Sequence, residues 1–292
     1  MTGTRRRDQE GRSCANGQRA HGLSEFRVAP SDVHKRNPDR VWVDAAEPQP
    51  DGGLKVSYSI PRHRRGPRLA ELLEVQRQAG LAHAHRILAV SHGAVFALQV
   101  MELTVLGTAP RLETELACGV VNVRAAAIKS TSRGIVRSAV HHFAFGAGNV
   151  PLARGTTAAL FVDPDVYARW RGRRPALDRV ADCGFDQASA RATPLVVDGT
   201  DPILSDHDSE HVTAMALACA VERGVSREKN GARLIALSMT FRNYIEHSPT
   251  PIVITRLVDE EGSLSGLVVQ DRVACATFTG CVTPVGPSEI GP

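Results

Sequence analysis

Aromatic side chains are scarce in this 292-residue sequence, where they occupy only 4% of the positions. A hydrophobic core must therefore be built from Val, Leu, Ile and Ala, and an apolar content of 42% is enough for one. Long hydrophobic runs are also missing, since none approaches the roughly 20 apolar residues that cross a bilayer. No apolar segment follows the basic N-terminus, as one does in a secretion signal. These absences predict a soluble, cytoplasmic protein without a membrane partner.

The cysteines lack the spacing of a disulfide framework or of a zinc site. No CxxC pair occurs among Cys14, Cys118, Cys183, Cys219, Cys275 and Cys281, which is typical of reduced thiols in a chain of this size. His207-x-x-Glu210-His211 matches an inverted zinc-protease motif. However, Ser205 or Asp206 resembles a helix N-cap, so the two histidines would straddle the helix start instead of sharing one face. We therefore expect no metal and no cofactor.

Positive charge gathers at two places in a chain whose formal net charge is +4. The first twenty residues contain Arg5, Arg6, Arg7, Arg12 and Arg19, and a second cluster contains Arg62, Arg64 and Arg65. Aromatic residues do not alternate with these charges, so the pattern does not favour nucleic-acid binding. A solvated tail or a contact with an acidic partner accounts for the same charges.

The first half of the chain predicts one helix and several strands. Residues 1–28 are polar and lack periodicity, so we expect a disordered tail. Alternating apolar residues on both sides of the turn at 48–53 predict a β-hairpin over 40–60. Helical spacing then begins at Pro67. Four β-type runs follow the helix, at 94–105, 116–127, 134–145 and 151–162. One helix followed by an antiparallel meander is an α+β unit.

The same order of elements recurs in the second half. A short helix and a basic linker at 163–180 precede a weak strand region, which is followed by a helix from about Asp208 to Arg223. Four further strands are expected at 233–243, 251–259, 264–271 and 273–283. A repeat at a spacing of about 145 residues indicates an internal duplication. The predicted division is a tail at 1–28, a first domain at 29–172 and a second domain at 173–292.

The duplication has a physical reason. A single helix cannot cover a long antiparallel sheet, and each sheet has exposed edges. Pairing two copies edge to edge gives one continuous sheet around two helices. Hot-dog proteins make this arrangement as homodimers. We therefore expect a double hot-dog pseudo-dimer, with each antiparallel sheet wrapped on a central helix, that is complete as a monomer.

Four polar residues lie on one side of the first predicted helix: Glu74, Arg77, Gln78 and His85. A buried Glu and a buried Arg need partners, because an isolated buried charge is costly. One interpretation is a structural ion pair one turn apart. The other is an active-site cluster between the repeats, where a desolvated carboxylate has a pKa suited to general-base catalysis.

The helix segment Glu74-x-x-Arg77-Gln78-Ala-Gly-Leu resembles the helix signature of the AfsA family of bacterial γ-butyrolactone signal synthases. Val33-His34-Lys35 and Pro61-Arg62-His63 occupy the places of that family's Val-His-Lys and Pro-Arg-x-His segments. Further similar segments lie at 166–172, 201–212 and 241–244. The ordered resemblance covers residues 33–285 and both repeats.

AfsA-like proteins join a β-ketoacyl group, carried as an acyl-carrier-protein thioester, to dihydroxyacetone phosphate. The ester closes to a phosphorylated butenolide, a precursor of signals that control antibiotic production. The resemblance therefore implies an acyltransferase whose partners are an acyl carrier protein or acyl-CoA thioester and dihydroxyacetone phosphate. Glu74 would activate or orient the substrate hydroxyl, and Arg77 would hold the phosphate or the developing oxyanion. Gln78 completes the expected catalytic set, and Glu74→Gln is expected to abolish transfer with the fold intact.

The expected substrate-binding residues are Arg62, His63, His85, His211, Cys219 and Glu222. The family's second helix repeats the Glu-x-x-Arg signature, whereas this chain has Cys219 and Glu222 at those two positions. Either the activity is altered or lost, or the site uses the first repeat only. An Ala-Cys-Ala segment is also more typical of core filling than of a nucleophile.

Two other functions stay open. A hot-dog thioesterase or dehydratase acts on acyl thioesters through an acid or base at the helix start, which Asp206, His207 or Glu210 would supply. A non-catalytic acyl-binding regulator would explain the missing charges of the second repeat.

Overall fold

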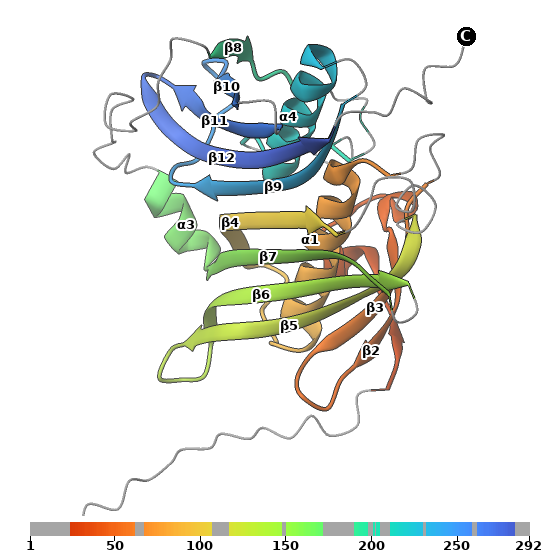
Figure 1. The fold of residues 1–292 in the computed structure, drawn as a ribbon. Helices are drawn as coiled ribbons and strands as arrows, with labels where there is room; N and C mark the ends of the chain where they lie inside the picture. Colours follow the sequence, from red (N-terminus) through yellow and green to blue (C-terminus); the bar gives the residue numbers. More distant parts are fainter. Residues whose placement is uncertain are drawn as a thin grey trace, which may run out of the picture.

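The computed structural model describes residues 24–61, 67–106, 117–147, 150–171, 190–197, 201, 203–204, 211–229, 232–258 and 262–283. These residues form a twelve-stranded antiparallel sheet with two long helices behind it (Figure 1). The elements of the first half are β1 Phe26–Arg27, η1 Pro30–Val33, η2 Pro38–Arg40, β2 Val43–Pro48, β3 Leu54–Ser59, α1 Leu69–Arg86, β4 Val95–Val105, β5 Cys118–Ser130, β6 Val136–Ala147, β7 Val150–Val162 and α3 Pro164–Arg171. Those of the second half are β8 Arg191–Pro194, α4 Ala214–Glu228, β9 Arg233–Phe241, β10 Ile252–Val258, β11 Ser263–Gln270 and β12 Val273–Thr283.

The strand order of the sheet is β1-β2-β3-β5-β6-β7-β4-β9-β12-β11-β10-β8. Outward from the central pair β4–β9, the strands β7, β6, β5 and β3 on one side correspond to β12, β11, β10 and β8 on the other. Met101 lies opposite Met239 in the central pair, and Val100 lies opposite Thr240. Hydrogen bonds therefore join the two halves into one continuous sheet.

The predicted meander is wrong at its first strand. β4 does not neighbour β5; it pairs with β7 on one edge and with β9 on the other. The connection from Val105 to Cys118 is long enough to carry the chain across the sheet, whereas short turns keep β5, β6 and β7 adjacent. The order of the apolar runs fixes where strands occur along the chain, but it does not fix their neighbours.

Several predicted boundaries also shift, and one of them is the end of α4, which lies at Glu228 instead of Arg223. β1 lies inside the segment 1–28, and Val28 is buried, so regular structure begins earlier than expected. Helix α4 begins at Ala214 instead of about Asp208, with the Thr213 side chain accepting a hydrogen bond from the Ala216 N–H at 3.2 Å. Thr213 is the last capping residue before the buried run of α4, so the helix starts where burial starts. Ser205 and Asp206, the expected caps, lie outside the described residues.

Helix α1 is buried around most of its circumference, because the sheet contacts it through strands of both halves. Leu72, Leu73 and Val75 belong to the same apolar core as Leu217 and Val221 of α4. One core therefore runs through both halves, and every polar side chain of α1 that it encloses needs a partner. Among the described helices, none has the length and apolar character needed to cross a membrane.

Candidate active site

A cavity of about 1060 Å³ lies between the two halves of the sheet. The first half contributes side chains of α1, β4, β6 and β7, and the second contributes the start of α4 and residues 241–246. Its apolar wall includes Phe96, Met101, Phe143, Phe161, Met215 and Phe241. A cavity of this size and lining is typical of a small-molecule site.

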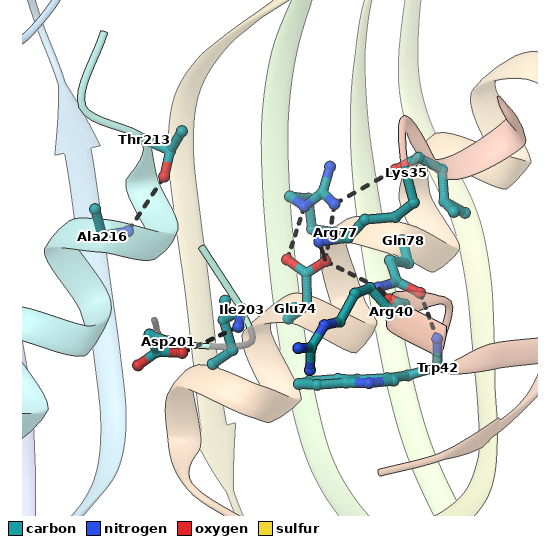
Figure 2. A network of polar contacts seen from close by, with 11 residues as sticks. Lys35, Arg40, Trp42, Glu74, Arg77, Gln78, Asp201, Ile203, Thr213 and Ala216 are labelled. Carbon is teal, nitrogen blue, oxygen red and sulfur yellow. Dashed lines mark hydrogen bonds and ion pairs between the residues drawn. The ribbon is translucent and has the colours of Figure 1, made fainter. Parts of the chain in front are cut away.

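Glu74 is the centre of a polar network beside this cavity (Figure 2). Its two carboxylate oxygens each accept a hydrogen bond of 2.8 Å from Arg77, one from Nε and one from Nη2. Lys35 Nζ lies 3.2 Å from Oε1, and Gln78 Nε2 donates to the same oxygen at 2.8 Å. The Glu74 and Lys35 side chains are 1% and 2% exposed, and both Lys35 and Arg77 line the cavity. The stripe of polar residues predicted on α1 is therefore a connected cluster.

The charge state of Glu74 differs from the expectation for a general base. Burial alone would raise its pKa, but the charges of Arg77 and Lys35 and the hydrogen bonds of Arg77 and Gln78 outweigh burial and lower the pKa to about 2. A carboxylate with such a pKa is a weak proton acceptor at neutral pH. The network therefore suits Glu74 to holding Arg77 in place on the cavity wall, and Arg77 Nη2 also donates to the Val33 carbonyl at 3.4 Å.

Gln78 has a structural function within this network. Its Nε2 also donates to the Arg40 carbonyl at 2.8 Å, and its Oε1 accepts from the Trp42 N–H at 2.8 Å. Through these hydrogen bonds Gln78 links the backbone segment between η2 and β2 to α1 (Figure 2). Gln78 does not line the cavity, so its contribution to a reaction would be indirect.

His85 lies behind the cavity wall in a group of three imidazoles. Its Nδ1 donates to the Val90 carbonyl at 2.8 Å, so its Nε2 accepts from His34 Nε2 at 2.9 Å. Its ring stacks on that of His92 with centroids 4.2 Å apart. His34 and His92 line the cavity, whereas His85 does not. Burial lowers the pKa of His85, which keeps this imidazole neutral.

The second helix places different residues at the equivalent positions. Cys219 follows Ala214 by the same number of residues as Glu74 follows Leu69, and Glu222 corresponds in the same way to Arg77. Cys219 is fully enclosed in the core, and burial raises the pKa of its thiol, so it does not act as a nucleophile. Glu222 Oε1 accepts from the Leu69 N–H at 2.8 Å and closes the start of α1. Neither residue lines the cavity, although both were expected to bind substrate.

The start of α4, in contrast, opens onto the cavity. Thr213, Ala214 and Met215 line it, together with His211, whose ring lies 5.6 Å from that of Tyr244. The first N–H groups of a helix lack intrahelical acceptors and carry partial positive charge. Thr213 Oγ1 accepts from the N–H of Ala216, and the two residues before it in the helix, Ala214 and Met215, line the cavity.

No protein-family model matches this chain, and no curated protein matches it either. Solved structures do match. The 12:0-ACP thioesterase from Umbellularia californica aligns with a TM-score of 0.54 at 13% identity, over 80% of this chain and 98% of that one. An acyl-ACP thioesterase from Bacteroides thetaiotaomicron aligns with a TM-score of 0.53 at 10% identity, again over 80% and 98%. The chain has a hot-dog fold. At such identities the likeness concerns the fold alone.

Several expected residues of this hot-dog protein lie outside the described part of the chain, namely Arg62, His63, Asp206, His207 and Glu210. Of the other expected residues, Arg77 and His211 reach the cavity. The described residues include no group of three or more His, Cys, Asp or Glu side chains placed to hold a metal ion.

Sequence reasoning missed several cavity residues, among them His34, Lys35, Gln76 and His141. Lys35 and His34 belong to a segment that carried the family resemblance, so a signal for them was present. His34 also has a positive φ of 53°, which is uncommon outside glycine and turns the chain between η1 and η2. Gln76 and His141 had no local signal.

Proposed function

We propose that this chain is an enzyme that acts on acyl thioesters. The observation that carries the proposal is the cavity between the two halves of the sheet, which we call the junction cavity. Its apolar wall suits an acyl chain, and Arg77 and the start of α4 also line it. Two of the solved structures that align with the chain are described as acyl-ACP thioesterases, which supports the same substrate class. Arg77 is fixed by two hydrogen bonds to Glu74, so it can stabilise negative charge without first being ordered.

The reaction would begin with attack of an oxygen nucleophile on the thioester carbonyl carbon. The amides at the start of α4 and the Arg77 guanidinium would stabilise the resulting oxyanion. His211 lines the cavity beside this helix start and would take the proton of the nucleophile. The carbon–sulfur bond then breaks, and the proton passes to the thiolate that leaves. In this scheme Glu74 is a positioning residue.

The nucleophile distinguishes two reactions. Water gives hydrolysis, which is the activity described for the aligned structures. The hydroxyl of dihydroxyacetone phosphate gives the acyl transfer that the AfsA resemblance implies. One observation favours the transfer as a second candidate: Lys35 and Arg77 place two cationic groups around the single carboxylate of Glu74, and both residues line the cavity. Such a pair suits a phosphate.

Incubation of the protein with a β-ketoacyl thioester, with and without dihydroxyacetone phosphate, tests the proposal. Release of free acid without the acceptor indicates hydrolysis, and an ester formed only with the acceptor indicates transfer. Binding without turnover would contradict an enzymatic function and favour a regulatory acyl-binding protein. Arg77→Met should lower the turnover about 100-fold or more, as expected for loss of an oxyanion-stabilising group. Arg124→Met, which removes an exposed arginine paired with Asp51, is the matched control and should have no effect.

A further inference from the structure

A cluster of three polar residues interrupts the apolar wall of the junction cavity. It consists of Gln76 on α1, His141 on β6 and Thr157 on β7. Gln76 and His141 are 0% and 3% exposed, and Phe143 lies close to them on the same wall. None of the three takes part in the reaction proposed above, so their hydrogen bonds need a separate explanation.

The amide of Gln76 has a fixed orientation. Its NH₂ group donates to the Thr156 carbonyl at 3.2 Å and to Thr157 Oγ1 at 2.8 Å. A carbonyl oxygen only accepts, so the amide cannot be turned around. Gln76 Oε1 is left buried, and it has no hydrogen-bond partner among the described residues. Glycine at position 155 admits this oxygen, because a Cβ there would collide with it. A buried acceptor without a hydrogen-bond partner is energetically unfavourable, so a ligand donor that bonded to this oxygen would gain stability from it.

The protonation of His141 follows from its neighbour. His83 Nε2 lies 2.9 Å from the Gly52 carbonyl, which only accepts, so the proton of His83 is on Nε2. His83 Nδ1 must then accept from His141 Nε2, 3.1 Å away. Burial keeps both imidazoles neutral and lowers the pKa of His141 to about 3. The remaining ring nitrogen of His141, Nδ1, therefore has a lone pair and no proton.

The residues that carry the two acceptors, Gln76 and His141, lie close together on the cavity wall. His141 and Thr157 are directly opposite each other in the β6–β7 ladder, where side chains on the same face are close neighbours. Gln76 donates a hydrogen bond to Thr157 through its Nε2, so Gln76 and His141 are neighbours on the cavity wall. Both acceptors are uncharged, which favours a neutral donor over a buried ammonium. A hydroxyl group carries one proton and can donate it to either acceptor, whereas a keto group, which only accepts, can donate to neither.

We propose that this cluster binds a hydroxyl group carried on the acyl chain, so that the preferred ligands are hydroxyacyl thioesters. The inference rests on the proposed acyl-thioester function, and it adds a specificity site away from the reacting carbonyl. Gln76 and His141 would select the position of the hydroxyl along the chain. A site built to bond a hydroxyl discriminates against the analogue that lacks it, because its acceptors then stay unpaired.

Calorimetric binding of dodecanoyl-CoA and of hydroxydodecanoyl-CoA isomers, with the hydroxyl at successive carbons, tests this proposal without requiring turnover. One isomer should bind about tenfold or more tightly than the unsubstituted chain. Equal binding of all the chains would overturn the hydroxyl site while leaving acyl binding in place. If none of them binds, the proposed function fails as well, so the two failures are distinguishable.

Two variants locate the preference. Gln76→Met and His141→Phe each remove an acceptor while keeping a side chain of similar size, and loss of the acceptor that binds the hydroxyl proton should reduce the preference for the hydroxylated isomer. Phe96→Leu on the same cavity wall is the matched control and should change the affinity for both ligands equally. A preference that survives in both acceptor variants would overturn the assignment. If a variant does not fold, the comparison of ligands on the unaltered protein still decides whether the preference exists.

Discussion

Arg77 and Glu222 occupy equivalent positions on the two central helices, where one is a basic residue and the other an acidic one. Arg77 borders the junction cavity, whereas the Glu222 carboxylate binds the Leu69 N–H at the start of α1. The start of α4, which is equivalent to that of α1, opens onto the cavity instead. The starts of α1 and α4, which are equivalent in the two repeats, therefore have different surroundings. The start of α4 lines a cavity that Arg77 also borders, whereas the start of α1 is occupied by the carboxylate of Glu222.

This difference predicts one ligand site in each chain. Titration of the protein with a long-chain acyl-CoA should give a stoichiometry of one, because Glu222 and Cys219 fill the second equivalent place. Calorimetry or native mass spectrometry measures this number directly. Two equal binding sites per chain would contradict the asymmetry described here.

Glu222 should make the stability of the protein depend on pH. Burial raises its pKa, against the attraction of Arg68, from the ordinary value of 4.5 to about 7. Between these values the folded state binds more protons than the unfolded state, so the free energy of unfolding falls as the pH rises from about 4.5 to about 7. Glu222→Gln removes this dependence and should stabilise the protein at pH 8 by up to about 3 kcal/mol. Urea unfolding at pH 5 and pH 8 measures the effect. Exposed Glu47→Gln, the control, should show no comparable gain.

Glu74→Gln should impair stability as well as activity. The sequence alone suggested an intact fold, but Lys35 Nζ lies 3.2 Å from this carboxylate in a buried site. Removing one partner of a buried ion pair costs about 3–5 kcal/mol, because the other charge stays uncompensated. Thermal denaturation should show a lower midpoint for this variant. The combined Lys35→Met and Glu74→Gln variant should recover most of the loss, and a midpoint unchanged in the single variant would argue against the ion pair.

The same carboxylate predicts acid sensitivity. Its pKa is lowered from 4.5 to about 2, so its contribution to stability is complete above pH 4.5 and is lost as the pH falls toward 2. The stability of the Glu74→Gln variant should therefore depend less on pH over this interval than that of the unaltered protein. Unfolding free energies measured at pH 2.5 and pH 5 compare the two proteins.

Cys219 should be inert toward thiol reagents in the folded protein. The residue is buried and its thiol stays neutral because burial raises the pKa, whereas Cys118 is exposed. Brief alkylation with iodoacetamide followed by peptide mapping should label Cys118 and leave Cys219 unmodified until the protein is unfolded in urea. Rapid labelling of Cys219 in the native state would contradict the packing of α4.

Local patterns predicted most of the elements. Alternation around the turn at 48–53 matches the β2–β3 hairpin, and helical spacing after Pro67 matches α1. The strand neighbours were harder to predict, because the pairing of β4 with β7 and β9 depends on contacts distant in the sequence. The start of α4 was misplaced because several capping residues precede it and burial selects Thr213.

The site was predictable only in part. The spacing of Glu74 and Arg77 on one helix placed them together, and the structure joins them. The direction of the pKa shift of Glu74 was not predictable, because it depends on Lys35, which lies on a separate segment before the hairpin. Likewise, the lone pairs of Gln76 and His141 are defined by partners on β7, by His83 on α1 and by the turn at Gly52.

The β4–β9 pairing joins two halves that are encoded separately. In an assembly of two identical chains every substitution appears in both copies, so a helix cannot lose a charged residue on one side alone. Here a cysteine can replace the counterpart of Glu74 while Glu74 itself is kept. One half can therefore keep the charged residues that border the cavity, while the equivalent residues of the other half stabilise the fold.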